Sequence, residues 1–293
     1  MPDAHLDLLT SALALLAAAQ FAAGTLLVKR GLQYADSITG ATIQIAVSMV
    51  VFALAAPFTI QASDWLSPAV GIFAALGLLR PSVSTMLANE GTRRLGPTIS
   101  TTMESMSPFF AVLGGVLVLS ERLATTTAVG TLGVVAGVAV LSARGRLPRA
   151  WSTWALLFPL GAALIRSGAH VAAKMGLLLL PNVVLSGLVA YTVSFVVALG
   201  VRAARPAAAR PRPSREALLW FVLSGITNAG AIFALNSALM LGQVVLVSPV
   251  VAAYPVFTIL GSRLFFRQDP ITGRMVLALL LVVPSVMLIT LGR

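Results

Sequence analysis

Cysteine is absent from this 293-residue chain, and histidine and acidic residues are rare. The lack of cysteine excludes disulfides, thiolate nucleophiles and cysteine-ligated metals. The two histidines, His5 and His170, are too few for a convincing metal centre. The sequence also shows no phosphate-binding loop, nucleotide-binding cassette or pair of catalytic carboxylates. We therefore expect no metal, no cofactor, no enzymatic activity and no direct use of ATP.

Charge is scarce as well, because 10% of the residues are charged while 58% are hydrophobic. Globular domains carry about a quarter charged residues, so this composition predicts a membrane protein. A net charge of +11 would suggest a nucleic-acid partner in a soluble protein. Here the positive residues lie in short loops, where orientation signals belong, so we expect no nucleic acid. The N-terminal segment lacks a basic region and is untypical of a cleaved signal peptide.

Apolar segments of spanning length fill the chain. A membrane-spanning helix needs about 20 mostly apolar residues. Ten segments meet this criterion between polar, proline or glycine breaks, at about 8–29, 38–57, 68–92, 98–119, 125–142, 154–174, 183–203, 216–240, 245–266 and 273–291. The sequence thus predicts an all-α integral membrane protein with ten transmembrane helices and the lipid bilayer as its main partner.

The chain repeats itself at a nearly constant offset. Residues 107–121 align with residues 254–268, which pairs Pro108 with Pro255. We expect two five-helix repeats, at residues 1–149 and 150–293. Because five is an odd number, the second repeat is inserted inverted relative to the first. Inverted repeats are typical of secondary transporters that bind substrate near the bilayer midplane.

The basic residues indicate the orientation. Arg122, Arg293 and Lys174 lie in or near the even-numbered loops and the chain ends. Fifteen others lie in the odd-numbered loops: Lys29, Arg30, Arg93, Arg94, Arg144, Arg146, Arg149, Arg202, Arg205, Arg210, Arg212, Arg215, Arg263, Arg267 and Arg274. Under the positive-inside rule, the odd-numbered loops are cytoplasmic and both termini lie outside.

The end of each half carries a family pattern. Residues 107–141 and 254–288 each hold a proline-containing helix and an apolar last helix. Residues 120–123 (SERL) keep a Glu-Arg-Leu turn between them, whereas residues 267–270 (RQDP) depart from it. In these features the chain resembles an EamA-type transporter of the drug/metabolite transporter superfamily. The resemblance implies export of metabolites such as amino acids from the cell, across an inner membrane. Relatives are often drawn with cytoplasmic termini, but we follow the charges.

Arg80 is the most unusual residue of the spans. It lies some twelve residues from either end of its segment, and a charge near the bilayer centre costs at least about 2.5–3.5 kcal/mol. Pro81 beside it frees a backbone carbonyl, and we expect a kink there, as at Pro108 and Pro255. Either another helix neutralises Arg80 or it faces a substrate cavity, where Ser84 and Asn89 would join it.

Glu104 is the only acidic residue deep in a span, and it occurs in one half only. A buried glutamate either pairs with an arginine, here Arg80 or Arg166, or carries a proton. Arg166 and His170 follow on one face of the sixth span, with Lys174 one turn later at its end. Like charges on one face need water, an acid or an anionic ligand. Three further residues could bind substrate, although each could equally be a packed core residue: Asn228, Asn236 and Tyr254.

Glycines at positions 130, 133 and 137 give the fifth span a small-residue face. Such a face serves close packing within the chain or association with a second copy. The sequence therefore allows a monomer or a homodimer through the fifth or tenth helix.

These observations predict a secondary transporter that exports a small anionic or zwitterionic metabolite and works by alternating access. Proton coupling would run through Glu104. The alternative is a proton-coupled multidrug exporter of organic cations. A channel or a membrane scaffold is less well supported, because no continuous polar row crosses the spans.

Overall fold

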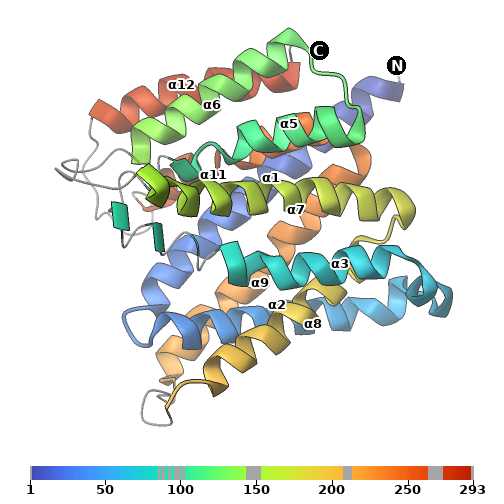
Figure 1. Ribbon diagram of the computed structural model, residues 1–293, viewed down its shortest axis with the longest axis vertical. Helices are drawn as coiled ribbons and strands as arrows, with labels where there is room; N and C mark the ends of the chain where they lie inside the picture. The colour runs from blue at the N-terminus through green and yellow to red at the C-terminus, as the bar shows by residue number, and fades with distance from the viewer. Residues whose placement is uncertain are drawn as a thin grey trace.

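The computed structural model describes residues 2–84, 87, 90–91, 94–95, 100, 103–142, 153–206, 213–262 and 273–291. Every regular element in these residues is a helix (Figure 1). The helices are α1 Pro2–Gly31, α2 Ser37–Thr59, η1 Ala62–Leu66, α3 Ala69–Leu78, η2 Leu79–Val83, α5 Ser107–Leu119, α6 Thr125–Ser142, η3 Thr153–Leu156, α7 Leu157–Leu179, α8 Val183–Ala203, α9 Arg215–Leu241, α10 Val244–Val251, α11 Tyr254–Gly261 and α12 Gly273–Leu291.

Six stretches have the length and apolar composition to cross a membrane: Leu6–Gly31, Ser37–Thr59, Trp154–Leu179, Val183–Ala203, Arg215–Leu241 and Gly273–Leu291. Four shorter apolar helices complete the series within the described residues: Ala69–Leu78, Ser107–Leu119, Thr125–Val140 and Val244–Thr258. Each of these helices falls within or close to one of the ten expected segments. The prediction of an all-α, multi-pass membrane protein is confirmed.

The most extensive helix contacts join the first half of the chain to the second. Helix α1 packs on α9, α6 on α12, α2 on α8 and α9, and α5 on α7 and α10. In Figure 1, α12 and α6 cross at one edge of the molecule, while α2 and α8 form the opposite edge. The two halves therefore interleave, and neither buries its apolar side chains alone.

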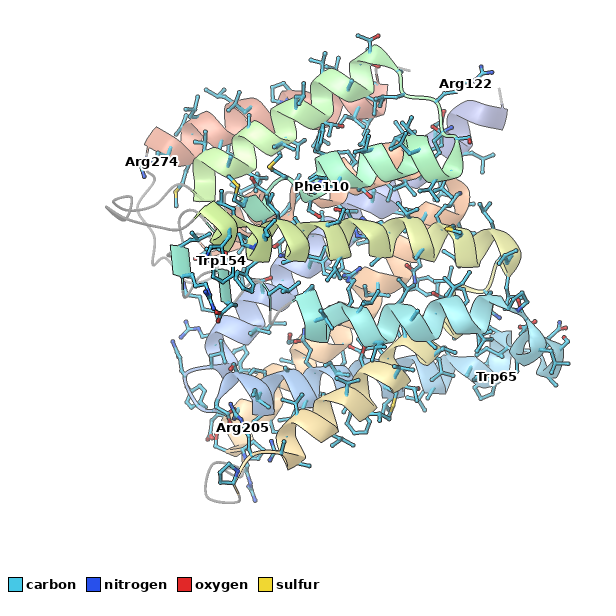
Figure 2. The ribbon with its side chains drawn as sticks, viewed as in Figure 1. Trp65, Phe110, Arg122, Trp154, Arg205 and Arg274 are labelled. Carbon is cyan, nitrogen blue, oxygen red and sulfur yellow. The ribbon has the colours of Figure 1, made fainter. Side chains whose placement is uncertain are left out.

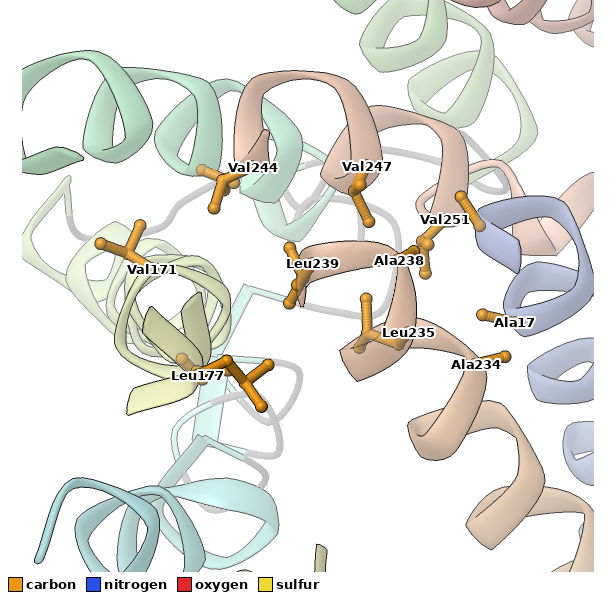
Figure 3. Close-up of a cluster of buried hydrophobic side chains, with 14 of the residues drawn as sticks. Ala17, Val171, Leu177, Ala234, Leu235, Ala238, Leu239, Val244, Val247 and Val251 are labelled. Atoms are coloured by element: carbon orange, nitrogen blue, oxygen red, sulfur yellow. The ribbon is translucent and has the colours of Figure 1, made fainter. Parts of the chain in front are cut away.

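The largest buried cluster lies where α7, α9, α10 and α1 meet (Figure 3). Leu235 and Leu239 of α9 are no more than 1% exposed, and they lie beside Val244 and Val247 of α10. Many neighbours are alanines, which let the helices approach closely. In lipid the association of helices depends on such close packing, because the acyl chains are as apolar as the side chains.

The small-residue face of α6 is occupied within the chain. A Cβ atom added to Gly130, Gly133 or Gly137 would overlap Ile289, Ser285 or Val282 of α12. These glycines therefore bring α6 and α12 together, which is the intramolecular alternative of the two that the sequence allowed. A homodimer through this particular face would have to displace α12.

The labelled arginines lie at both ends of the helices (Figure 2). Arg205 and Arg274 lie at one end and Arg122 at the other (Figure 2). The N-terminus lies toward the Arg122 end, and α12 runs toward it from the Arg274 end (Figure 1). At the Arg205 end, Asp36 caps α2 through the amides of Ile38 and Thr39. Partial burial raises the pKa of Asp36, but these hydrogen bonds and Arg205 outweigh it and hold the pKa below its ordinary value.

Candidate functional site

Helix α3 ends in a break at Arg80. Within the π-helical turn Leu79–Val83, Arg80 has extended backbone angles, with φ −117° and ψ 132°. Ser194 of α8 satisfies the freed backbone, since its hydroxyl donates to the carbonyls of Gly77 and Arg80 at 2.9 Å each. Gly77 itself lies so close to the backbone of Ala190 that a Cβ could not fit. The break is therefore held against α8, and it fixes the direction in which Arg80 leaves the helix.

Two further breaks occur at matching places in the two halves. Turns at Ser105–Met106 and Ala252–Ala253 interrupt the helical path, and α5 and α11 begin after them at Ser107 and Tyr254. A proline follows each first residue, where its missing N–H is tolerated. Interrupted helices of this kind present helix N-termini, which favour negative charge, to substrate sites in transporters.

A cavity of about 380 Å³, here called the charged cavity, lies at these breaks. Five residues that the sequence singled out as candidates for binding line it: Arg80, Glu104, Arg166, His170 and Tyr254. Pro108 and Pro255 line it as well, together with Ser107 and Ser248. Helices α1, α5, α6, α7, α10 and α11, the turn at Arg80 and the residues just before α5 supply its walls. The cavity therefore collects residues from both halves of the chain.

Glu104 and Arg166 form an ion pair in the charged cavity. The guanidinium Nη2 of Arg166 donates to Oε2 of Glu104, and Ser100 donates to Oε1 at 3.2 Å. The Glu104 side chain is 16% exposed and that of Arg166 is 36% exposed, so part of the guanidinium remains open to the cavity. Nε of Arg166 is buried without a hydrogen-bond partner among the described residues. Arg166 is thus only partly satisfied by Glu104.

Serine hydroxyls hold α7 against its neighbours at the wall of the charged cavity. Nδ1 of His170 lies 2.7 Å from Oγ of Ser248, which orients the imidazole across the interface between α7 and α10. One turn earlier on α7, the hydroxyl of Ser167 donates to the carbonyl of Ser107 at 2.6 Å. These contacts tie the break before α5 and the end of α10 to α7, which also carries Arg166.

Arg80 also lines a second cavity of about 310 Å³, here called the neutral cavity. Apart from Arg80, its polar lining consists of uncharged amides and hydroxyls: Gln44, Ser186, Tyr191, Ser194, Asn228 and Asn236. Asn228 donates to Tyr191 and, at 3.3 Å, to Ser48. Asn236 donates to Ser186 at 3.3 Å. The predicted binding residues therefore divide between two cavities that share one guanidinium.

Two predicted residues lie elsewhere. Ser84 is 5% exposed and lines neither cavity, and Asn89 lies outside the described residues. Several polar cavity residues were not predicted as ligands, among them Ser248 and Gln44. Both sit in runs that read as ordinary apolar helix, so only the fold assigns them to a cavity.

The sequence did not predict that Glu121 and Lys174 act together. The Glu121 carboxylate accepts hydrogen bonds from the amides of Val244 and Val245, at 2.8 and 2.9 Å, and thereby caps α10. The Lys174 ammonium donates to the carbonyls of Leu239 and Gly242, at 2.7 and 2.9 Å, and caps α9. We call this set of four hydrogen bonds the corner clasp, because it holds both sides of the α9–α10 corner.

The lining of the charged cavity thus holds two arginines, one of them paired with the single carboxylate, beside two helix N-termini. Arginine binds carboxylate and phosphate groups bidentately, whereas a lone carboxylate already bound to Arg166 is a poor site for an organic cation. A membrane-embedded cavity with this charge balance at interrupted helices is suited to small charged molecules.

Comparison with known proteins agrees with this fold. The model of the EamA-like transporter family matches residues 8–143. A solved structure titled "Crystal structure of protein" superposes with a TM-score of 0.80, over 97% of this chain and 96% of that one, at 18% identity. In all, 29 chains of solved structures are similar. A search of curated proteins found no match.

The family match and the apolar helices indicate a multi-pass membrane transporter of the drug/metabolite type. Residues 8–143 match the EamA-like transporter family, in agreement with the resemblance that the sequence pattern had indicated. At 18% identity, the similarity to that solved structure shows the fold alone.

Proposed function

We propose that this protein is a secondary active exporter of a small anionic or zwitterionic metabolite, such as an amino acid, in an inner membrane. The observation that carries the proposal is the charged cavity, whose lining holds Arg80 and Arg166 but only one carboxylate among the described residues, that of Glu104. A substrate carboxylate or phosphate would complete the charge balance that the protein leaves open.

The transport cycle in this proposal is alternating access between two inverted repeats, residues 1–149 and 150–293. Its support is the matching position of the breaks at Ser105–Met106 and Ala252–Ala253, together with the interleaved packing. The repeats would rock about the cavities, with the proline-linked breaks at Pro108 and Pro255 as hinges. The protein acts as a monomer, since α12 already occupies the glycine face of α6.

Glu104 is the proton carrier in this proposal. Its ion pair with Arg166 and its contact with Ser100 hold the carboxylate at the cavity wall. When the carboxylate of a zwitterionic substrate takes the guanidinium of Arg166, the ionised Glu104 is free to bind the substrate's ammonium group, and a proton on Glu104 competes with that group. Substrate binding and proton binding are thereby linked through one arginine.

The alternative, a multidrug exporter of organic cations, would use Glu104 as the cation site. The ion pair with Arg166 occupies that carboxylate, and Arg80 lines the same cavity. A cation would therefore meet net positive charge, so the anionic or zwitterionic substrate is the better fit.

The test is transport by purified protein in liposomes. We expect uptake of labelled alanine or lactate into preloaded vesicles and none of tetraphenylphosphonium. Arg80→Lys keeps the charge but loses the planar fork, so it should weaken substrate binding at least about tenfold while the protein still inserts and folds. Arg122→Lys, at an exposed loop position, is the control and should transport normally. Transport of the cation alone would refute the proposal, as would full activity of Arg80→Ala.

A further inference from the structure

The two cavities differ in chemistry, although they share Arg80. Charged side chains on the wall of the charged cavity come from Glu104 and Arg166 as well as from Arg80. In the neutral cavity Arg80 is the one charged residue among those described. A molecule that reaches both cavities would therefore meet charge on one side of Arg80 and uncharged polar groups on the other.

The two asparagines that line the neutral cavity have amide oxygens that no described residue uses. The Nδ2 group of Asn228 donates to Tyr191 and Ser48, and that of Asn236 donates to Ser186. The Oδ1 atoms of both asparagines accept no hydrogen bond from the described residues. An asparagine oxygen has two acceptor positions, and a lining acceptor without a partner is complementary to an O–H or N–H group.

Burial makes these acceptors selective. Asn236 is 6% exposed, and apolar residues such as Ile45, Leu76 and Ile232 surround the polar groups. A ligand group that brings no donor would leave the acceptors unpaired after water is displaced, which is a strong basis for discrimination. A cationic group is disfavoured because Arg80 is the nearest charge.

The position of Arg80 is fixed independently of any ligand. The extended backbone at Arg80, the hydroxyl of Ser194 on its carbonyl and the close approach of Gly77 to α8 hold it at the boundary. Its guanidinium can thus anchor an anion while the rest of that molecule extends along α8 and α9. About 310 Å³ is at the lower end of ligand-sized cavities, which is enough for a short side chain.

We propose that the neutral cavity is a subsite for an uncharged, hydrogen-bond-donating tail of the transported anion, with Asn228 and Asn236 as its specificity-determining residues. This inference rests on the proposed function and narrows its substrate class. The substrate is a small carboxylate or phosphate, with or without an amino group, whose tail carries a hydroxyl or amide N–H.

Matched ligand pairs test the subsite in the purified full-length protein. Glutamine and glutamate γ-methyl ester differ in the donor of the tail, as do 4-hydroxybutyrate and 4-methoxybutyrate. Alanine and butyrate supply the head groups alone. By calorimetric titration in detergent, we expect the donor-bearing member of at least one pair to bind about tenfold tighter than its partner. One hydrogen bond to a buried acceptor that would otherwise stay unpaired accounts for a difference of this size.

Variants assign that preference to the asparagines. In Asn236→Leu and Asn228→Leu the preference should fall to near one, while binding of the head-group ligands stays within about twofold. Thr192→Val removes a hydroxyl from the exposed face of α8 and should keep the preference. If Asn228→Leu loses stability because Tyr191 loses its partner, the Asn236→Leu variant alone tests whether the preference depends on an asparagine. Equal binding within both pairs, with alanine or butyrate bound, overturns the subsite and leaves the proposed function standing. Failure of all six ligands to bind overturns both.

Discussion

The charged residues of the spans have different roles, which their depth alone does not reveal. Arg166 is paired with Glu104, whereas Arg80 lines both cavities and is held through its backbone. Lys174, on the same face of α7 as Arg166, instead caps α9. A basic residue inside a membrane protein can therefore be a partner, a ligand or a cap, and its neighbours from other helices determine which.

Glu104→Gln separates the proton-carrier role from a purely structural one. As a carrier, Glu104→Gln should still bind substrate and exchange it across the membrane, but it should no longer accumulate substrate against a gradient. If Glu104 is only a structural partner, its replacement would leave Arg166 uncompensated and would lower the stability of the protein. The cost would stay below the roughly 3–5 kcal/mol of a fully buried pair, because Arg166 is partly exposed.

The readouts are counterflow, pH-driven accumulation and the melting temperature in detergent. The double variant Glu104→Gln with Arg166→Gln should regain melting temperature if the pair is structural, and it should not regain accumulation if Glu104 carries the proton. A Glu104→Gln protein that is stable and accumulates substrate normally would exclude both roles.

At the scale of elements, broken helices and their caps position the cavities. The turn at Arg80 and the breaks before α5 and α11 each leave backbone groups that another helix or the cavity must satisfy. The α9–α10 corner solves the same problem with the corner clasp, in which one carboxylate and one ammonium cap two helix ends. Gly115 has no side chain, and this leaves room for the carboxylate of Glu121.

Glu121→Gln should destabilise the corner by about 1–2 kcal/mol, because it replaces one of the two accepting oxygens with an NH2 donor and removes the negative charge that complements the N-terminus of α10. Lys174→Met should act similarly on the end of α9. We expect each variant to lower the melting temperature in detergent. Arg122→Gln, a charge removal at the adjacent exposed position, should leave it unchanged. A melting temperature of Glu121→Gln equal to that of Arg122→Gln would mean that the clasp adds no stability.

At the scale of the whole molecule, the two halves of the chain interleave into one body. Because α1 packs on α9 and α2 on α8, every cavity wall contains helices from both halves. Relative motion of the halves therefore changes both cavities at once. The N-terminus lies toward the Arg122 end of the bundle, opposite Arg205 and Arg274, in the relative arrangement that the loop charges require.

Reporter fusions test the absolute orientation. We predict that a reporter inserted after Arg212 is cytoplasmic and that a reporter at the C-terminus is outside, because fifteen basic residues lie in the odd-numbered loops. Paired enzymatic reporters, one active in each compartment, should give opposite signals at the two positions. A cytoplasmic C-terminal reporter would show that the positive-inside rule fails for this chain.

The sequence by itself determined the membrane class, the positions of the spans and the unusual depth of Arg80 and Glu104. Hydrophobic length and the cost of a buried charge are properties of a single segment, so they can be read along the chain. The tertiary structure decided that Glu104 pairs with Arg166, that Arg80 stands between two cavities, and that Glu121 caps a helix 123 residues away. Each of these depends on which helices become neighbours. In interleaved halves the neighbours are distant in sequence, and no local pattern records them.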